Sequence, residues 1–231
     1  MITINNKELL KKAILSGQLT NENIHEYDYS SITDFSNLFK DCTDLIICPN
    51  LDTRNVTNMY GMFSGCKNLF KIPQLNTTNV ENMDYMFFGC ENLEKITYIN
   101  TSNTHSMIGT FSNCLKLQNV ELLDTSKVLS FESTFANCIS LNEVPSINTF
   151  NAKVFESMFA GCKNLVKIPN IDLSNAINTK DMFFACSNLK EVPHFILGEN
   201  VISDRMFKHC TKLDTVKLVD SSELKNIKEK H

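Results

Sequence analysis

The chain has 231 residues and a formal net charge of −4 at pH 7. It contains no tryptophan and no run of lysine or arginine, a composition that argues against nucleic-acid binding. No apolar stretch approaches the roughly 18 residues that a membrane-spanning helix needs, so membrane insertion is not expected.

The first predicted element is a helix in the segment NNKELLKKAILSG, which we expect to cover one end of the molecule. Asn5 or Asn6 is the expected N-cap, and Gly17 is the expected end. Its apolar side comprises Leu9, Leu10, Ala13 and Ile14. Lysines interrupt these residues, so the segment does not resemble a secretory signal. The chain as written is therefore expected to be cytoplasmic, exported without an N-terminal signal, or given without one.

A 24-residue pattern then repeats without insertion or deletion. Its fixed points are a cysteine, a phenylalanine three residues earlier and a leucine three residues later. The cysteines are Cys42, Cys66, Cys90, Cys114, Cys138, Cys162, Cys186 and Cys210. Such a period predicts a solenoid whose turns bury their apolar residues against one another. The expected divisions are an N-terminal cap and link (1–30), the solenoid (31–217) and a C-terminal cap (218–231), where a polar helix should begin at Ser221 or Ser222.

A short strand is predicted after the leucine of each repeat. In one repeat it covers Lys95, Ile96 and Thr97, and the equivalent strands should stack in parallel into a sheet roughly 40 Å long. In five repeats a proline follows the Ile or Val position, at Pro49, Pro73, Pro145, Pro169 and Pro193. Because proline cannot donate a ladder hydrogen bond, each strand is expected to stop there.

A polar cluster and a short helix complete each predicted repeat. Clusters such as DTRN from Asp52 and NTSN from Asn100 are typical of turns and helix N-caps. Gly65 is suited to the left-handed end of a helix. The apolar residues between them recur at the spacing of one helix face, as in Val56, Met59, Met62, Phe63 and Cys66. The methionines at this spacing are interpreted as core.

The cysteines are expected to be buried thiols. Eight share one repeat position, and the ninth, Cys48, takes a position held elsewhere by Ile or Val. No CxxC pair is present, so neither a zinc site nor any other metal or cofactor is expected. Like positions on successive turns can lie within disulfide range, so a disulfide ladder remains the alternative.

The frame N-V-x-x-M-x-x-M-F-x-x-C-x-x-L-x-x-I-P, present as NVTNMYGMFSGCKNLFKIP from Asn55, closely resembles the BspA-like leucine-rich repeats. The helix KELLKKAI followed by SSITDFSNLF also resembles the lead-in of such proteins. The resemblance covers residues 30–217 and implies a right-handed solenoid used for protein binding, found in bacterial surface, adhesion and phage-associated proteins and in protists. The predicted fold is thus an α/β repeat solenoid of leucine-rich-repeat type, with about eight 24-residue turns of short parallel strand plus short helix and a helical N-terminal cap.

No catalytic motif is found, and the histidines occupy different repeat positions, so the chain is not expected to be an enzyme. Two classes of function remain. One is an adhesin-like or effector-like scaffold that binds a protein partner, as a monomer. The other is a structural or spacer protein, for example a component associated with a phage.

One surface patch is a candidate binding site within the scaffold. The prolines after the strand positions are interrupted inside the array at Thr97 and Glu121, beside Tyr98 and Leu122. Exposed apolar residues next to charges are typical of a protein-binding patch, although drift in the middle repeats would give the same pattern. The candidate residues, named here the mid-array patch, are Lys95, Thr97, Tyr98, Asn119, Glu121 and Leu122.

Overall fold

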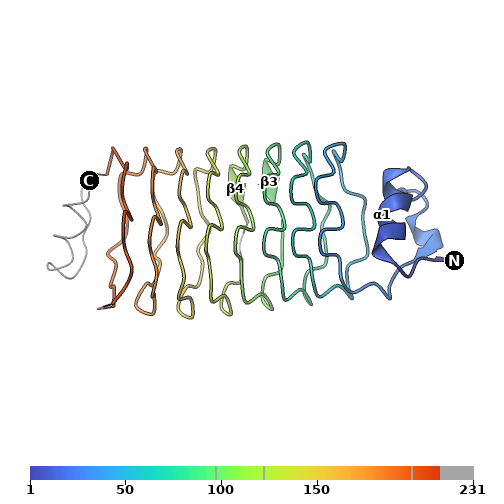
Figure 1. Cartoon of the computed structure of the whole chain (residues 1–231), viewed down its shortest axis with the longest axis horizontal. Helices are drawn as coiled ribbons and strands as arrows, with labels where there is room; N and C mark the ends of the chain where they lie inside the picture. The colour runs from blue at the N-terminus through green and yellow to red at the C-terminus, as the bar shows by residue number, and fades with distance from the viewer. Residues whose placement is uncertain (97, 122, 199, 214–231) are drawn as a thin grey trace.

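The computed structural model describes residues 1–96, 98–121, 123–198 and 200–213. Similar coils stack side by side along one axis, with helix α1 at the N-terminal end of the stack (Figure 1). The regular elements are β1 (Ile2–Thr3), α1 (Lys7–Leu15), the short helix η1 (Ile24–Glu26), β2 (Tyr27–Asp28), β3 (Lys95–Ile96) and β4 (Asn119–Val120). The predicted C-terminal helix and the division 218–231 lie outside the described residues.

Helix α1 begins where its sequence provides a cap. The side chain of Asn6 accepts a hydrogen bond from the Glu8 backbone N–H at 2.7 Å. The helix buries Leu10 and Ala13, whereas Leu9, predicted on its apolar side, is exposed. Lys7 reaches the first coil and donates to the Ser36 carbonyl at 2.9 Å. The N-terminal segment is further tied together by β1, which pairs in parallel with β2.

The short helix predicted in each repeat is wrong for the described coils, where a different structure occupies those residues. We call this part of a coil the turn segment; in the coil that ends at Cys66 it spans residues 58–66. Its backbone N–H groups alternate between two kinds of acceptor. Met62 donates to Met59 within the coil at 3.1 Å, while Phe63 donates to Met86 of the next coil at 2.8 Å. Gly61, at φ 57°, and Gly65, at φ 75°, prevent continuous α-helix.

The turn segments form a ladder along the whole described array. Parallel bridges join one residue from each coil to its equivalent 24 residues later: Asp34, Asn58, Asn82, Ser106, Ser130, Val154, Asn178 and Ile202. Two positions per coil have positive φ; the first is occupied by Asn37, Gly61, Tyr85, Gly109, Ser133, Ser157, Asp181 and Arg205. The apolar periodicity correctly marks the buried residues, but the backbone reaches them through turns.

Strands are shorter and rarer than predicted. We call the six residues that begin at the leucine of each repeat the strand segment, for example residues 93–98. Within the described residues, β3 and β4 are the one pair of two-residue strands in this segment, and an isolated bridge joins Ile47 to Lys71. Glu121 donates its backbone N–H to the Ile96 carbonyl at 3.4 Å, a bond that the proline found there in other repeats could not make. The ranges that the structure describes therefore do not form the predicted continuous sheet.

The core repeats in register with the coils. One phenylalanine per coil forms a column of stacked rings, for example Phe87 on Phe111 at 5.8 Å between centroids. Beside this column, the thiol of Cys114 donates to the Phe87 carbonyl at 3.0 Å. All nine cysteines are free thiols; seven are buried as predicted, whereas Cys42 and Cys210 are partly exposed. Burial raises the pKa of the Cys114 thiol to about 12, so this group stays protonated and unreactive at neutral pH.

The polar clusters form turns, as predicted, but do not cap helices. Asp52 accepts the backbone N–H of Arg54 at 3.2 Å, and Asn100 accepts that of Ser102 at 2.9 Å. The buried threonine in the same cluster links one coil to the next: the hydroxyl of Thr53 donates to the Asn76 carbonyl at 2.8 Å. These bonds satisfy polar groups where the chain reverses direction.

Candidate protein-binding surface

The structure brings part of the mid-array patch together at the β3–β4 pair. Lys95 and Asn119 are partners in its register, and both side chains are exposed because Ile96 and Val120, the next residues, point into the core. Glu121 is also exposed. Thr97 and Leu122 lie outside the described residues, so the structure does not place them.

Tyr98 is the largest exposed side chain described in this patch. It is 48% exposed and lines a shallow depression of about 320 Å³. The other lining residues belong to its own coil and the preceding one: Gln74, Leu75, Asn76, Thr77, Thr78 and Asn100. The depression therefore offers a ring surrounded by amides and hydroxyls, a composition suited to contact with a polypeptide.

Sequence reasoning missed an apolar group on the strand segments of the preceding coils. Ile46, Ile47 and Phe70 are each at least half exposed. The Phe70 backbone N–H donates to the Ile46 carbonyl at 2.9 Å, so these two residues are neighbours across adjacent coils. Ile46 and Phe70 occupy the position after the repeat leucine, which Glu94 and Gln118 occupy in later repeats. This contrast between apolar and polar residues is the signal that could have identified them. These apolar residues therefore lie on coils N-terminal to the mid-array patch.

A second group that was missed lies on the turn segments. Tyr60, Tyr85 and Phe88 form a cluster, with Tyr85 at 5.7 Å from Tyr60 and 6.0 Å from Phe88 between ring centroids. Burial, followed by the charge of Glu132, raises the pKa of the Tyr85 hydroxyl. These aromatic residues stand in repeat positions held elsewhere mainly by Gly, Ser, Ala or charged residues, which is the signal that could have identified them.

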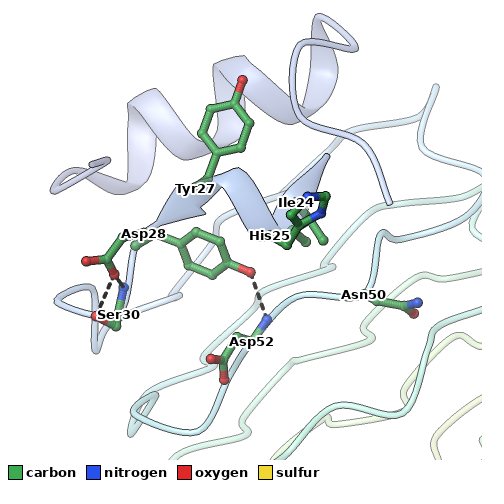
Figure 2. A pocket seen from close by; sticks show the side chains of 8 residues that line it. Ile24, His25, Tyr27, Asp28, Ser30, Asn50 and Asp52 are labelled. Atoms are coloured by element: carbon green, nitrogen blue, oxygen red, sulfur yellow. Dashed lines mark hydrogen bonds between the residues drawn. The ribbon is translucent and has the colours of Figure 1, made fainter. Parts of the chain in front are cut away.

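Two further depressions lie near the ends of the array. The smaller, of about 200 Å³, is formed between the N-terminal link and the first coil (Figure 2). There the Tyr29 hydroxyl accepts the Asp52 backbone N–H at 2.8 Å, and Ser30 donates to Asp28, which lowers the pKa of that carboxyl group. The first bond joins the link to the coil, and the second lies within the link. We therefore interpret the depression as a structural junction.

The larger depression, of about 510 Å³, lies toward the C-terminal end. Its lining includes two exposed apolar residues, Phe150 and Ile196, together with His194 and Asp172. Phe150 donates its backbone N–H to Asn148, which continues the turn pattern of the polar clusters. The residues are those of the repeat surface and form no arrangement of nucleophile and base.

In the ranges that the structure describes, no group of three or more His, Cys, Asp or Glu side chains could hold a metal ion. The helices in those ranges are also too short or too polar to cross a bilayer. The chemistry available on the described surface is therefore that of exposed rings, aliphatic side chains, amides and charges.

The solved structures that resemble this chain include three leucine-rich repeat proteins. A leucine-rich repeat protein from T. pallidum is 18% identical with a TM-score of 0.49, and the match covers 83% of this chain and 74% of that one. A leucine-rich cell surface protein from Faecalibacterium prausnitzii A2-165 is 18% identical, with a TM-score of 0.38 and coverage of 86% and 79%. A leucine-rich repeat protein from Bacteroides ovatus ATCC 8483 is 19% identical, with a TM-score of 0.34 and coverage of 80% and 64%.

Comparison with curated proteins finds no match. A family model described as "Mycoplasma protein of unknown function, DUF285" matches residues 8–118 and 92–195. The two matches together span most of the solenoid and overlap in its middle, as expected for a repeated unit. The chain belongs to this DUF285 family.

Proposed function

We propose that the chain is a non-enzymatic scaffold that binds a protein partner, in an adhesin-like or effector-like role, through the mid-array patch. The observation that carries this proposal is the exposure of Tyr98 beside the β3–β4 pair. An aromatic ring that is 48% exposed offers a large apolar contact area, and Lys95 and Glu121 supply charges around it.

Further exposed apolar residues lie on the coils before the mid-array patch. Ile46, Ile47 and Phe70 lie on strand segments of the coils that precede β3. Exposed apolar side chains in adjacent coils are typical of a surface that becomes covered on binding. A partner that contacts Tyr98 and extends toward the N-terminal coils would cover them.

Rigidity supports the same proposal. The turn-segment ladder and the ring column fix each coil against the next, so the side chains of the patch are held in register before binding. A preorganised surface loses little conformational entropy when a partner docks. The repeat thus supplies the frame, and the residues that differ between coils supply the contact.

The proposal is tested by comparing partner recovery by three purified proteins from an extract of the source cells. The first is the wild type, and the second carries Tyr98→Ala, Glu121→Lys and Leu122→Ser. The third is a matched control with Asn170→Ala and Glu143→Lys, which makes the same charge change at exposed positions of other coils. Quantitative mass spectrometry should identify a protein recovered by the wild type and the control, and at least about tenfold less by the patch variant.

Equal recovery of every partner by a folded patch variant would contradict the mid-array patch. Absence of any saturable partner for all three proteins would instead favour the structural or spacer function. The far-ultraviolet circular dichroism and melting temperature of each variant show whether a loss of recovery reflects binding or unfolding.

A further inference from the structure

The aromatic cluster of Tyr60, Tyr85 and Phe88 is open to solvent. Tyr60 is 39% exposed and Phe88 is 38% exposed. Both rings are inclined by 70° to the ring of Tyr85. The cluster belongs to the turn segments of two adjacent coils and is separate in sequence position from the mid-array patch on the strand segments.

Further along the array, the same repeat positions form a similar ring site, and a side chain of the protein itself occupies it. Phe184 stands four repeats after Phe88, in the same position of its coil. The guanidinium of Arg205, from the next coil, lies over the Phe184 ring at 5.6 Å from the centroid. Arg205 also forms an ion pair with Asp181, which occupies the Tyr85 position. The chain therefore places an arginine on this ring position through a cation–π contact and a carboxylate.

At Phe88 the corresponding arginine is missing from the chain itself. The position of Arg205 is taken by Gly109, which has no side chain to extend over the ring. A Cβ on Gly109 would lie 2.6 Å from the Tyr85 ring, so the packing of Tyr85 requires a glycine there. As a result Phe88 is exposed, whereas Phe184 is half-buried.

Carboxylates lie close to the open rings. Asp84 precedes Tyr85 and is fixed by hydrogen bonds from the Ser106 hydroxyl at 2.7 Å and the Ile108 backbone N–H at 2.8 Å. The charges of Glu132 and Asp84 both contribute to the raised pKa of Tyr85, after the larger effect of burial. Lys67, which follows the turn segment of Tyr60, is paired with Glu91 at 3.1 Å. Ring faces and carboxylates together favour a cation.

We propose that Tyr60, Tyr85 and Phe88 receive an arginine side chain of a partner protein, in the place that Arg205 takes over Phe184. The guanidinium would lie on the exposed Phe88 ring, beside Tyr85 and near the carboxylates of Asp84 and Glu132. This site goes beyond the proposed function because it adds a contact on the turn segments and does not depend on the mid-array patch.

The probe is the peptide acetyl-Gly-Ser-Arg-Ser-Gly-amide, compared with the same peptide containing citrulline, a neutral analogue of arginine. The protein is labelled with fluorotyrosine, which reports on all 5 tyrosines by fluorine NMR. We expect saturable shifts at Tyr60 and Tyr85 with a Kd in the millimolar range, and binding of the citrulline peptide at least about tenfold weaker. The signals of Tyr27, Tyr29 and Tyr98 serve as internal controls.

Two variants test the site by using residues that the repeat already contains. Phe88→Ala installs the residue found at Ala136 and Ala160 and should weaken arginine binding severalfold. The double variant Tyr85→Asp/Gly109→Arg transplants the Asp181–Arg205 pair, whose φ angles of 54° and 57° match those of the recipient positions. The introduced arginine should lie over the Phe88 ring, exclude the arginine of the peptide, and so abolish the peptide-induced shift at Tyr60.

Equal shifts with arginine and citrulline, or an unchanged response in both folded variants, would overturn the proposal. So would a shift at Tyr98 as large as that at Tyr85, because it would indicate non-specific contact. The variant of the mid-array patch with Glu121→Lys and Leu122→Ser alone keeps Tyr98 as a reporter and should retain the arginine response. Failure of the mid-array patch and failure of the arginine site are therefore distinguishable.

Discussion

The turn segment and the strand segment of each coil hold neighbouring coils together in different ways. In the turn segment, alternate backbone N–H groups donate to the next coil, as Phe63 does to Met86 and Gly65 does to Phe88. In the strand segment, the two-residue pairing within the described ranges is that of β3 with β4. The turn segment thus fixes the array, which leaves the strand segment free to vary its residues.

The largest effect should follow from removing residues 1–30, which lie at the N-terminal end of the array. Lys7 contacts the turn segment of the first coil, and Asn21 accepts the Asn50 backbone N–H at 2.7 Å, at the end of the strand segment of that coil. Truncation would expose the buried rings of Phe35 and Phe39, and we expect aggregation or loss of protection at that end. Hydrogen exchange and light scattering would reveal it; a monomeric truncated protein with an unchanged melting temperature would show that the segment is not a cap.

Proline in the turn segment should destabilise the protein strongly. Ser133 has φ 53°, and its backbone N–H donates to the Glu156 carbonyl at 2.8 Å. Ser133→Pro removes this bond and imposes a negative φ, so we expect a loss of roughly 3 kcal/mol or more in the free energy of unfolding. Urea denaturation measures the loss, and Ser133→Gly is the matched control, since Gly61 and Gly109 already occupy this position. A loss below that of an ordinary surface substitution would contradict the fixing role of the turn segment.

Alkaline pH should weaken the turn segment through its cysteines. Burial raises the folded-state pKa of Cys114 from 9.0 to about 12, and the unfolded thiol ionises near the lower value. Stability is therefore complete below pH 9 and falls as the pH rises toward 12, by up to about 1.4 kcal/mol per pH unit for each such thiol. Cys114→Ala should reduce the slope of unfolding free energy against pH, measured with urea from neutral to alkaline pH. An identical slope in the variant would show that Cys114 does not contribute.

The smallest effect should come from proline in the strand segment. Glu121→Pro restores the residue found at Pro145 and Pro169 and removes one hydrogen bond of 3.4 Å to Ile96. The lost bond and the reduced entropy of the unfolded chain have opposite effects of similar size, so the change should stay within about 1 kcal/mol. Thermal unfolding would test this expectation, with Glu121→Ala as control. A loss as large as that of Ser133→Pro would abolish the distinction between the two segments.

The sequence predicts the period and the buried positions because both depend on apolar spacing. It fails on the backbone of the turn segment for a local reason. The first left-handed position holds glycine at Gly61 and Gly109, but Tyr85, Asp181 and Arg205 stand there in other coils, so no consistent residue signals the conformation. Hydrogen bonds between coils make that conformation stable, and such bonds are not visible in the order of residues.

The candidate surfaces were predictable to different extents. The mid-array patch could be identified because an absent proline is visible in the aligned repeats, although its binding role stays a proposal. The aromatic cluster could not be assembled in the same way, because Tyr60 and Tyr85 stand in different repeat positions of different coils. Their contact at 5.7 Å depends on the offset between adjacent coils, which only the folded chain defines.

The ladder of the turn segments also determines how the molecule would respond to mechanical force. Each coil is joined to its neighbours by the same set of short bonds, so tension applied along the stack would detach coils one after another. Each detached coil would release 24 residues, or about 80 Å of extended chain. A stretched molecule would thus lengthen in equal steps, and the coils still attached would keep their surfaces intact.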